Sequence, residues 1–170
     1  MTWRTLASTL VVPILCLLGS SCKSHQTSSV AIDLTKLQLQ LADQALPNQA
    51  EFMPIRSVAA LPEAVRARIG GMANPGEEFN VADVINSHLP MQRLVFAGAS
   101  GSYFLVHYEV GGRGHYYVTA LLDQSDQRAT ALWASVSAEK FASMEEFNQA
   151  ANTRTLKNQA AEVFCKAKCD

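Results

Sequence analysis

The chain has 170 residues, with 14 Lys and Arg against 15 Asp and Glu, which gives a formal net charge of −1 at pH 7. Because there is no basic excess to neutralise phosphates, the composition argues against nucleic-acid binding. The length beyond the first thirty residues suits one domain with a hydrophobic core.

The start of the chain has the three parts of a secretory signal. One positive charge, Arg4, precedes an almost wholly apolar run over residues 6–18, and small residues then lead to Cys22. The run is shorter than the roughly 20 apolar residues that a membrane-spanning helix needs, and Pro13 interrupts it. We therefore expect residues 1–21 to be a signal peptide.

The end of this segment reads LGSSC over residues 18–22 and resembles a lipobox, the sequence at which bacterial lipoprotein precursors are cut and lipidated. The usual pattern has leucine three residues before the cysteine, where this chain has Gly19. The resemblance is confined to the first 22 residues. It implies a multiply acylated Cys22 that anchors the protein in the bacterial cell envelope. Lys23, in place of Asp, implies the outer membrane, with the protein facing the periplasm.

Two alternatives stay open for this segment. An ordinary signal-peptidase cut would leave Cys22 as an unpaired thiol, or residues 6–18 would remain as an anchor. If Cys22 is lipidated and Cys16 leaves with the signal, two cysteines remain, an even number in an oxidising compartment. Loss of Arg4 would leave 13 basic residues against 15 acidic ones, a net charge of −2.

Residues 22–31 are predicted to be the lipidated cysteine followed by a flexible tether. The residues after Cys22 are small and polar and have no apolar periodicity. His25 lies within them and is interpreted as a solvated side chain. A single domain would then span residues 32–170.

Two helices are predicted in the first half of this domain. Residues 33–45 carry leucines at helical spacing behind a potential cap, Asp33, although their alternation also fits a strand. Residues 62–69 begin at a proline and end before two glycines, which suits a short helix with Val65 and Ile69 facing the core.

The middle of the chain is rich in apolar and β-branched runs separated by short polar or glycine-containing turns. Such a pattern is typical of an antiparallel meander. Four strands are predicted, over residues 94–99, 103–110, 115–122 and 129–135.

The chain is predicted to end in helix. Ser143 and Glu146 have the spacing of a capping box. An apolar stripe follows over residues 156–167, and residues 152–153 are a point at which the helix could divide in two. The predicted fold class is therefore α+β, with an antiparallel meander of about four strands flanked by N-terminal helices and a C-terminal helix.

One group of polar residues in the central hairpin could carry chemistry. If Val110 pairs with His115, then Glu109 faces Tyr116, and His107, Glu109 and Tyr116 share one face of the sheet. An imidazole, a carboxylate and a phenol within reach of each other could form an acid–base or ligand-binding cluster. The other interpretation is a hydrogen-bonded patch on the less buried face, and no catalytic residue is assigned.

Cys165 and Cys169 would lie on one face of a helix, close enough for a disulfide that holds the C-terminal end. Two free thiols, a dithiol redox pair and a metal site are the alternatives. The metal site would need a distant ligand such as His88 or His107. Neither a metal nor a cofactor is predicted.

The leading functional hypothesis is a non-catalytic envelope protein that is held to the membrane by its lipid and binds an envelope protein partner or supports an assembly. The first rival is a small-ligand binder or enzyme that uses His107, Glu109 and Tyr116. The second is a thiol or metal protein that uses Cys165 and Cys169.

Overall fold

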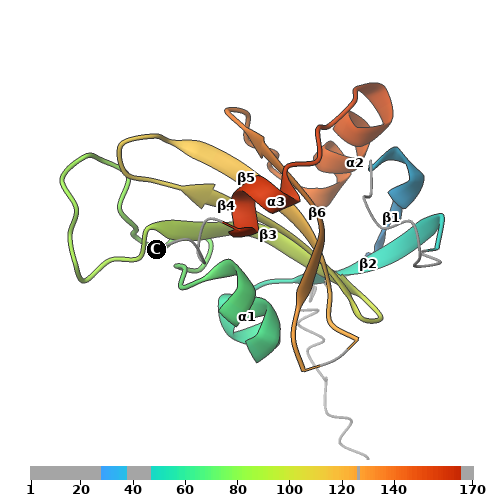
Figure 1. Cartoon of the computed structure of the whole chain (residues 1–170), viewed down its shortest axis with the longest axis horizontal. Helices are drawn as coiled ribbons and strands as arrows, with labels where there is room; N and C mark the ends of the chain where they lie inside the picture. The colour runs from blue at the N-terminus through green and yellow to red at the C-terminus, as the bar shows by residue number, and fades with distance from the viewer. Residues whose placement is uncertain (1–27, 38–46, 126, 166–170) are drawn as a thin grey trace, which may run out of the picture.

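The computed structural model describes residues 28–37, 47–125 and 127–165. Six strands form one curved antiparallel sheet in which each strand lies beside its neighbours in sequence (Figure 1). Three α-helices and two 3₁₀ turns complete these residues. The strands are β1 (Val30–Asp33), β2 (Gln49–Ile55), β3 (Gln92–Ser100), β4 (Tyr103–Val110), β5 (Tyr116–Asp123) and β6 (Thr130–Ser137), and the helical elements are η1 (Leu34–Lys36), η2 (Val58–Ala60), α1 (Glu63–Ile69), α2 (Met144–Thr153) and α3 (Ala160–Cys165).

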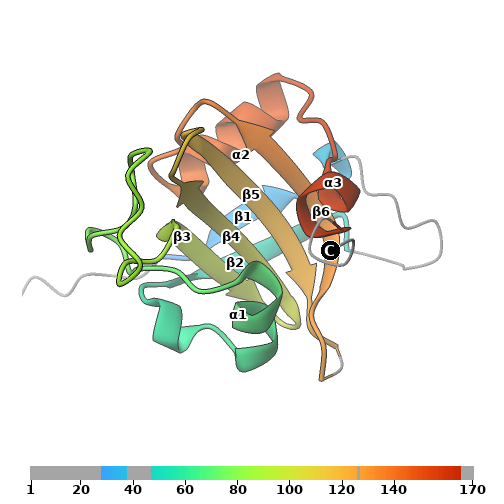
Figure 2. The ribbon, with the colours of Figure 1, turned by 60° about the vertical axis from the view of Figure 1, so that its left-hand side comes forward.

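Helices cover both faces of the sheet, and each face has its own apolar core (Figure 2). On one face, α1 and α3 pack against the sheet through Val65, Ile69 and Phe164. On the other face, Phe147 of α2 packs against Trp133, with 6.0 Å between the ring centroids. Both side chains are completely buried, so the contact between them lies at the centre of the apolar core on this face.

The predicted α+β class and the antiparallel meander are confirmed. The four predicted strands correspond to β3, β4, β5 and β6, and the bounds of β4 agree with the prediction. The helix predicted over residues 62–69 is α1, with Val65 and Ile69 buried as expected. Gly70 follows α1 with φ of 90°, a conformation that glycine adopts readily and that ends the helix.

The predicted number of strands is wrong, because β1 and β2 were not anticipated. In β2, the buried Ala50 and Phe52 alternate with exposed residues, which is the pattern of a half-buried strand. Pro54 lies within β2 and cannot donate a ladder hydrogen bond. It is accommodated because this part of β2 pairs only with β3, where Pro54 lies opposite Gly98.

The predicted helix over residues 33–45 is wrong in its described part. Asp33 is the last residue of β1, and its carboxylate accepts a hydrogen bond of 3.0 Å from the Thr35 N–H to cap the single turn of η1. Leu37 then returns to an extended conformation, and residues 38–46 lie outside the described residues. Leu34 and Leu37, whose spacing suggested a helix, are both buried because the single turn of η1 directs both side chains into the core. The strand β1 also includes the end of the range predicted as a tether, because it begins at Val30.

The C-terminal helices confirm the predicted Ser143 cap and the predicted division, while Glu146 reaches back to Ala142, one residue before the cap. The Ser143 hydroxyl accepts a hydrogen bond of 3.3 Å from the Glu146 N–H, and the Glu146 carboxylate accepts one of 2.6 Å from the Ala142 N–H. The helix α2 ends at Thr153, and α3 begins only at Ala160. Within the described residues, none of these helices has the length and apolar character needed to cross a membrane.

The two outermost described strands meet polar groups from the last part of the chain. The Asn148 side-chain amide donates a hydrogen bond of 2.9 Å to the Ala31 carbonyl in β1. At β6, the Gln159 backbone N–H donates to the Ala134 carbonyl at 2.6 Å, and the Gln159 side-chain oxygen accepts from the Val136 N–H at 3.1 Å. Backbone groups on both outer strands are therefore satisfied by residues of the C-terminal region.

Candidate functional site

The hairpin of β4 and β5 pairs one residue away from the predicted register. Val110 lies opposite Tyr116, because the turn comprises residues 111–115, and Glu109 therefore faces Tyr117. Side chains alternate between the two faces of a sheet, so a shift of one residue in β5 moves each of its side chains to the other face. Tyr116 consequently lies on the opposite face from His107 and Glu109, and the predicted three-residue cluster is wrong in its third member.

His107 is completely buried and has hydrogen-bond partners at both ring nitrogens. The Phe141 backbone N–H donates to Nε2 at 3.2 Å, so Nε2 is an acceptor, and Nδ1–H donates to the Thr119 hydroxyl at 2.9 Å. The ring stacks on Phe96 and Tyr117, with centroid distances of 4.9 and 5.7 Å. Burial lowers the pKa of His107 to about 4. A neutral imidazole with both nitrogens engaged is a packing residue and is not available as a metal ligand.

Glu109 forms an ion-pair network on the same face. Its Oε2 accepts from Arg93 Nη2 at 2.7 Å, and its Oε1 lies 2.5 Å from His115 Nε2. Burial acts to raise the pKa of Glu109, but the hydrogen bonds from Arg93 and His115 outweigh it and hold the pKa below its ordinary value. The Arg93 guanidinium also stacks on the Phe79 ring, 4.4 Å from its centroid. Both carboxylate oxygens are therefore occupied by structural partners.

Both ring nitrogens of His107 and both oxygens of Glu109 are engaged by neighbouring groups, and Tyr116 lies on the other face, so these three side chains do not converge on one site. The sequence prediction missed two members of the ion-pair network, Arg93 and His115. Arg93 lies opposite Glu109 because the register of β3 shifts between Leu94 and Phe96. A bulge of this kind leaves no mark in the hydrophobic pattern.

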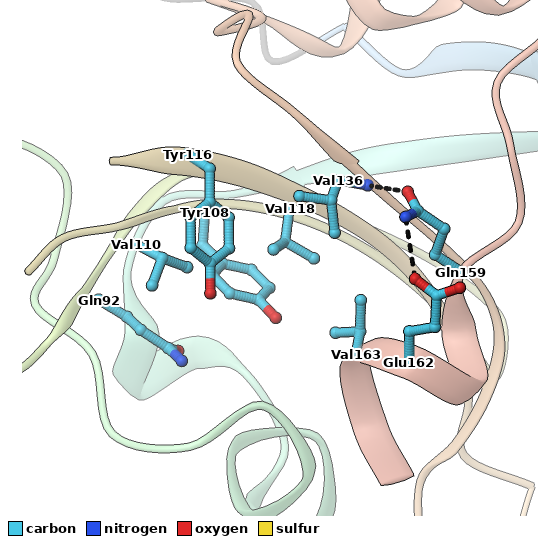
Figure 3. Close-up of a pocket in the computed structure, with 9 residues that line it drawn as sticks. All are labelled: Gln92, Tyr108, Val110, Tyr116, Val118, Val136, Gln159, Glu162 and Val163. Atoms are coloured by element: carbon cyan, nitrogen blue, oxygen red, sulfur yellow. Dashed lines mark hydrogen bonds between the residues drawn. The ribbon is translucent and has the colours of Figure 1, made fainter. Parts of the chain in front are cut away.

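A pocket of about 400 Å³ lies on the other face, between the sheet and α3. Tyr116 and Tyr108 extend side by side from the sheet into this pocket, and Glu162 and Val163 lie on its α3 side (Figure 3). Its volume is in the range of small-molecule sites. The lining residues are Gln92, Tyr108, Val110, Tyr116, Val118, Val136, Gln159, Glu162 and Val163.

A second feature that the sequence prediction missed is the segment of residues 81–91, which we name the 81–91 loop. It projects at one end of the sheet (Figure 1) and exposes large apolar side chains. Val84 is 87% exposed, Val81 57%, Ile85 52% and Met91 36%. Single exposed apolar residues are ordinary, but several within one loop indicate an interaction surface.

The 81–91 loop has a fixed internal structure, because the buried side chain of Asn80 joins its two halves. The Asn80 amide nitrogen donates to the Asn86 and Leu89 carbonyls at 3.0 and 2.7 Å, and its oxygen accepts from the Asn86 N–H at 2.7 Å. The Asn80 backbone N–H also donates to the Pro90 carbonyl at 2.9 Å. The segment is therefore a closed loop of the Ω type, with its ends tied together.

The turn between β4 and β5 supports this loop. The Gly111 N–H donates to the Met91 carbonyl at 2.9 Å. A Cβ atom on Gly111 would lie 1.7 Å from the Asn80 carbonyl oxygen, so only glycine allows the two backbones to approach this closely. Met91 and Ile85 in turn lie over Gly112, where an added Cβ would be 2.7 Å from the Met91 methyl group.

The remaining predicted sites fall largely outside the described residues. Cys22 and Cys169 are not among them, and only the backbone of Cys165 is described, at the end of α3. His88 is exposed within the 81–91 loop. Among the described residues, no three His, Cys, Asp or Glu side chains are close enough to hold a metal ion.

Comparisons with known proteins identify no relative from which a role could be transferred. No protein-family model matches the chain, and no similar curated protein or solved structure was found. The function is therefore inferred from the residues and their geometry alone.

Proposed function

We propose that this protein is a lipid-anchored protein of the bacterial cell envelope, held by Cys22, and that its domain docks onto a partner protein through the 81–91 loop. The observation that carries the docking proposal is an apolar loop that is exposed and at the same time internally fixed. The side chains of Val84 and Ile85 are exposed to solvent, while the Asn80 side-chain amide fixes the loop backbone through its hydrogen bonds to Asn86.

Burial of these side chains in a partner would remove apolar surface from water, which is worth roughly 25 cal/mol for each Å². A flexible loop would lose much of that gain in conformational entropy when it became ordered. Because the Asn80 hydrogen bonds already order the 81–91 loop, less is lost on binding.

The charge of the surrounding segment favours a protein over a lipid surface. Residues 77–91 contain Glu77, Glu78 and Asp83 and neither Lys nor Arg. Anionic phospholipids would repel this segment, whereas basic groups at the rim of an apolar cleft would complement it. The expected partner surface is therefore an apolar cleft with a basic rim.

The position of the loop also suits an anchored protein. In Figure 1, the 81–91 loop and β1 lie at opposite ends of the long axis. The proposed tether leads into β1, so a lipid on Cys22 would leave the loop at the end that is farther from the anchor. In that arrangement the apolar tip is presented to other envelope proteins.

Photo-crosslinking from the loop tests the docking proposal. A photoreactive amino acid at Val84, in the full chain expressed in its own cell envelope, is expected to give one discrete protein adduct. The same amino acid at Glu51, an exposed position in β2, is the matched control and is expected to give none. The additional substitution Ile85→Asp places a charge in the apolar tip and is expected to reduce the Val84 adduct at least fivefold.

Three results would contradict docking to a partner protein. They are equal adducts from positions 84 and 51, an adduct that Ile85→Asp leaves unchanged, and adducts formed with lipid alone. An adduct with twice the mass of the chain would identify the partner as a second copy of this protein.

The anchor is tested by the intact mass of the protein extracted from membranes, beside a Cys22→Ala variant. We expect a mass that corresponds to cleavage before Cys22 with two or three acyl chains, and loss of membrane association in the variant. An unlipidated mass with Cys22 retained as a thiol would overturn the anchor.

The same measurement tests the predicted Cys165–Cys169 disulfide. Alkylation before and after reduction is expected to label these two cysteines only after reduction. Labelling without a reductant would show free thiols and would make the thiol hypothesis the better one.

A further inference from the structure

The pocket between the sheet and α3 carries an inference that does not depend on the lipid anchor or on the 81–91 loop. Its floor is apolar, with Val110, Val118 and Val136 from the strands and Val163 from α3. Its polar side chains come from Gln92, Tyr108, Tyr116, Gln159 and Glu162, and such groups could hold one small molecule in a fixed orientation.

Two of these polar groups have no hydrogen-bond partner among the described residues. The Gln92 side-chain oxygen is buried and accepts no hydrogen bond. The Tyr108 hydroxyl also makes no hydrogen bond with a described residue, but unlike the Gln92 oxygen it is not closed off from the pocket. A ligand group that paired with the Tyr108 hydroxyl would gain a hydrogen bond, because that hydroxyl has no competing protein partner among the described residues.

The charge of the lining selects the class of ligand. Among the described residues that line the pocket, Glu162, at the exposed side of α3, is the one charged residue, and none of them is Lys, Arg or His. Gln159 donates a hydrogen bond of 3.1 Å to one Glu162 oxygen. The carboxylate would repel anions and attract cations into the pocket.

The two tyrosines add a second preference for a cation. Tyr108 and Tyr116 project from neighbouring strands on the same face, with their rings turned toward the cavity (Figure 3). The face of an aromatic ring attracts an ammonium group. Burial raises the pKa of the Tyr108 hydroxyl, so this group stays neutral and can accept a hydrogen bond from an ammonium N–H.

We infer that this pocket binds a small organic cation, a compound with one apolar ring or chain and one ammonium group. The apolar part would lie on the four valines, the ammonium group would donate to the tyrosine hydroxyls, and Glu162 would supply the opposing charge. The volume of about 400 Å³ admits a single ring with its substituent.

Three probes of the same shape test the inference on the full chain. Benzylamine is a cation at pH 7, benzyl alcohol is neutral and benzoate is an anion. Isothermal titration is expected to show saturable binding of benzylamine, weaker binding of benzyl alcohol and none of benzoate. Stronger or equal binding of benzyl alcohol or benzoate would overturn the cation class, and absence of saturable binding by all three would overturn the site.

Variants then connect the binding to the lining residues. Glu162→Gln is expected to weaken benzylamine binding by about two- to fivefold, the range of exposed ion pairs, and to leave benzyl alcohol unchanged. Glu51→Gln removes an exposed carboxylate far from the pocket and is the charge-matched control. Equal effects of the two substitutions would contradict a direct role of Glu162.

Tyr108→Phe separates binding from folding. Because the Tyr108 hydroxyl opens to the pocket and has no hydrogen-bond partner among the described residues, its removal is expected to leave the unfolding midpoint within the error of the measurement while weakening benzylamine binding. Val163→Phe fills the pocket and is expected to abolish binding of all probes. Unchanged binding in both variants would place the ligand elsewhere. As a control, Ile85→Asp in the 81–91 loop should leave the titrations of all three probes unchanged.

Discussion

Replacement of Gly111 by alanine is expected to lower the free energy of unfolding by roughly 3 kcal/mol or more, toward the upper end of what overpacking costs. The added Cβ would lie 1.7 Å from the Asn80 carbonyl oxygen and 3.1 Å from the Val81 Cα. Both are backbone atoms, so no rotation of a side chain relieves the overlap. The β4–β5 turn and the 81–91 loop would have to separate, and the hydrogen bond from Gly111 to Met91 would be lost.

Urea unfolding of the full chain, followed by the fluorescence of the buried Trp133, measures this change. Gly114→Ala is the matched control in the same turn, because its Cβ would meet nothing closer than 4.0 Å. A loss of stability at Gly111 no larger than at Gly114 would contradict the close approach of the two backbones. The variant should also reduce the crosslink from Val84, since the loop would no longer be held in place.

Acidification is the second change with a large expected effect. The pKa of His107 is about 4 in the folded protein against 6.5 for an ordinary histidine, so the unfolded chain binds a proton that the folded protein excludes between these values. Stability is therefore expected to fall by roughly 2.5 kcal/mol as the pH drops from 6.5 to 4, because each pH step of one within this window contributes up to about 1.4 kcal/mol.

His107→Gln removes this titration, and the slope of stability against pH between 6.5 and 5 is expected to flatten. Glu109 does not affect this slope between pH 6.5 and 5. Its pKa is lowered, so the stability that its ionised form contributes is lost only at lower pH. His88→Gln, at an exposed position, is the control and should retain the slope. If His107→Gln kept the dependence of the original protein, another group would be responsible for it.

The sequence allowed the fold class and the central strands to be predicted because their apolar runs are long and are separated by clear turns. The bounds of β4 and the burial of Val65 and Ile69 follow from such patterns. β1 was not recognisable in this way, because a strand of four residues that leads into a turn has too little pattern of its own.

The candidate sites were harder to predict, because they depend on single-residue details of the backbone. A turn that begins at Gly111 allows more than one length, and each added residue moves the β5 side chains to the opposite face. Tyr116 was therefore assigned to the Glu109 network, although it lines the pocket. The order of the 81–91 loop depends on the Asn80 amide, and a polar residue in a loop looks the same in sequence whether it is solvated or buried.

The amide contacts at the outer strands would have a consequence if the protein is held at a membrane, as we propose. Lipid anchoring confines copies to a surface and raises their local concentration, a condition in which an unpaired strand recruits the same strand of a neighbour. Asn148 occupies a carbonyl of β1, and Gln159 occupies both a carbonyl and an N–H of β6. Residues 148–159 thus occupy some of the backbone groups through which the outer strands could pair with another copy. A protease cut in this region is expected to release both contacts and to favour aggregation, and it would also loosen the core to which Phe147 and Ala151 belong.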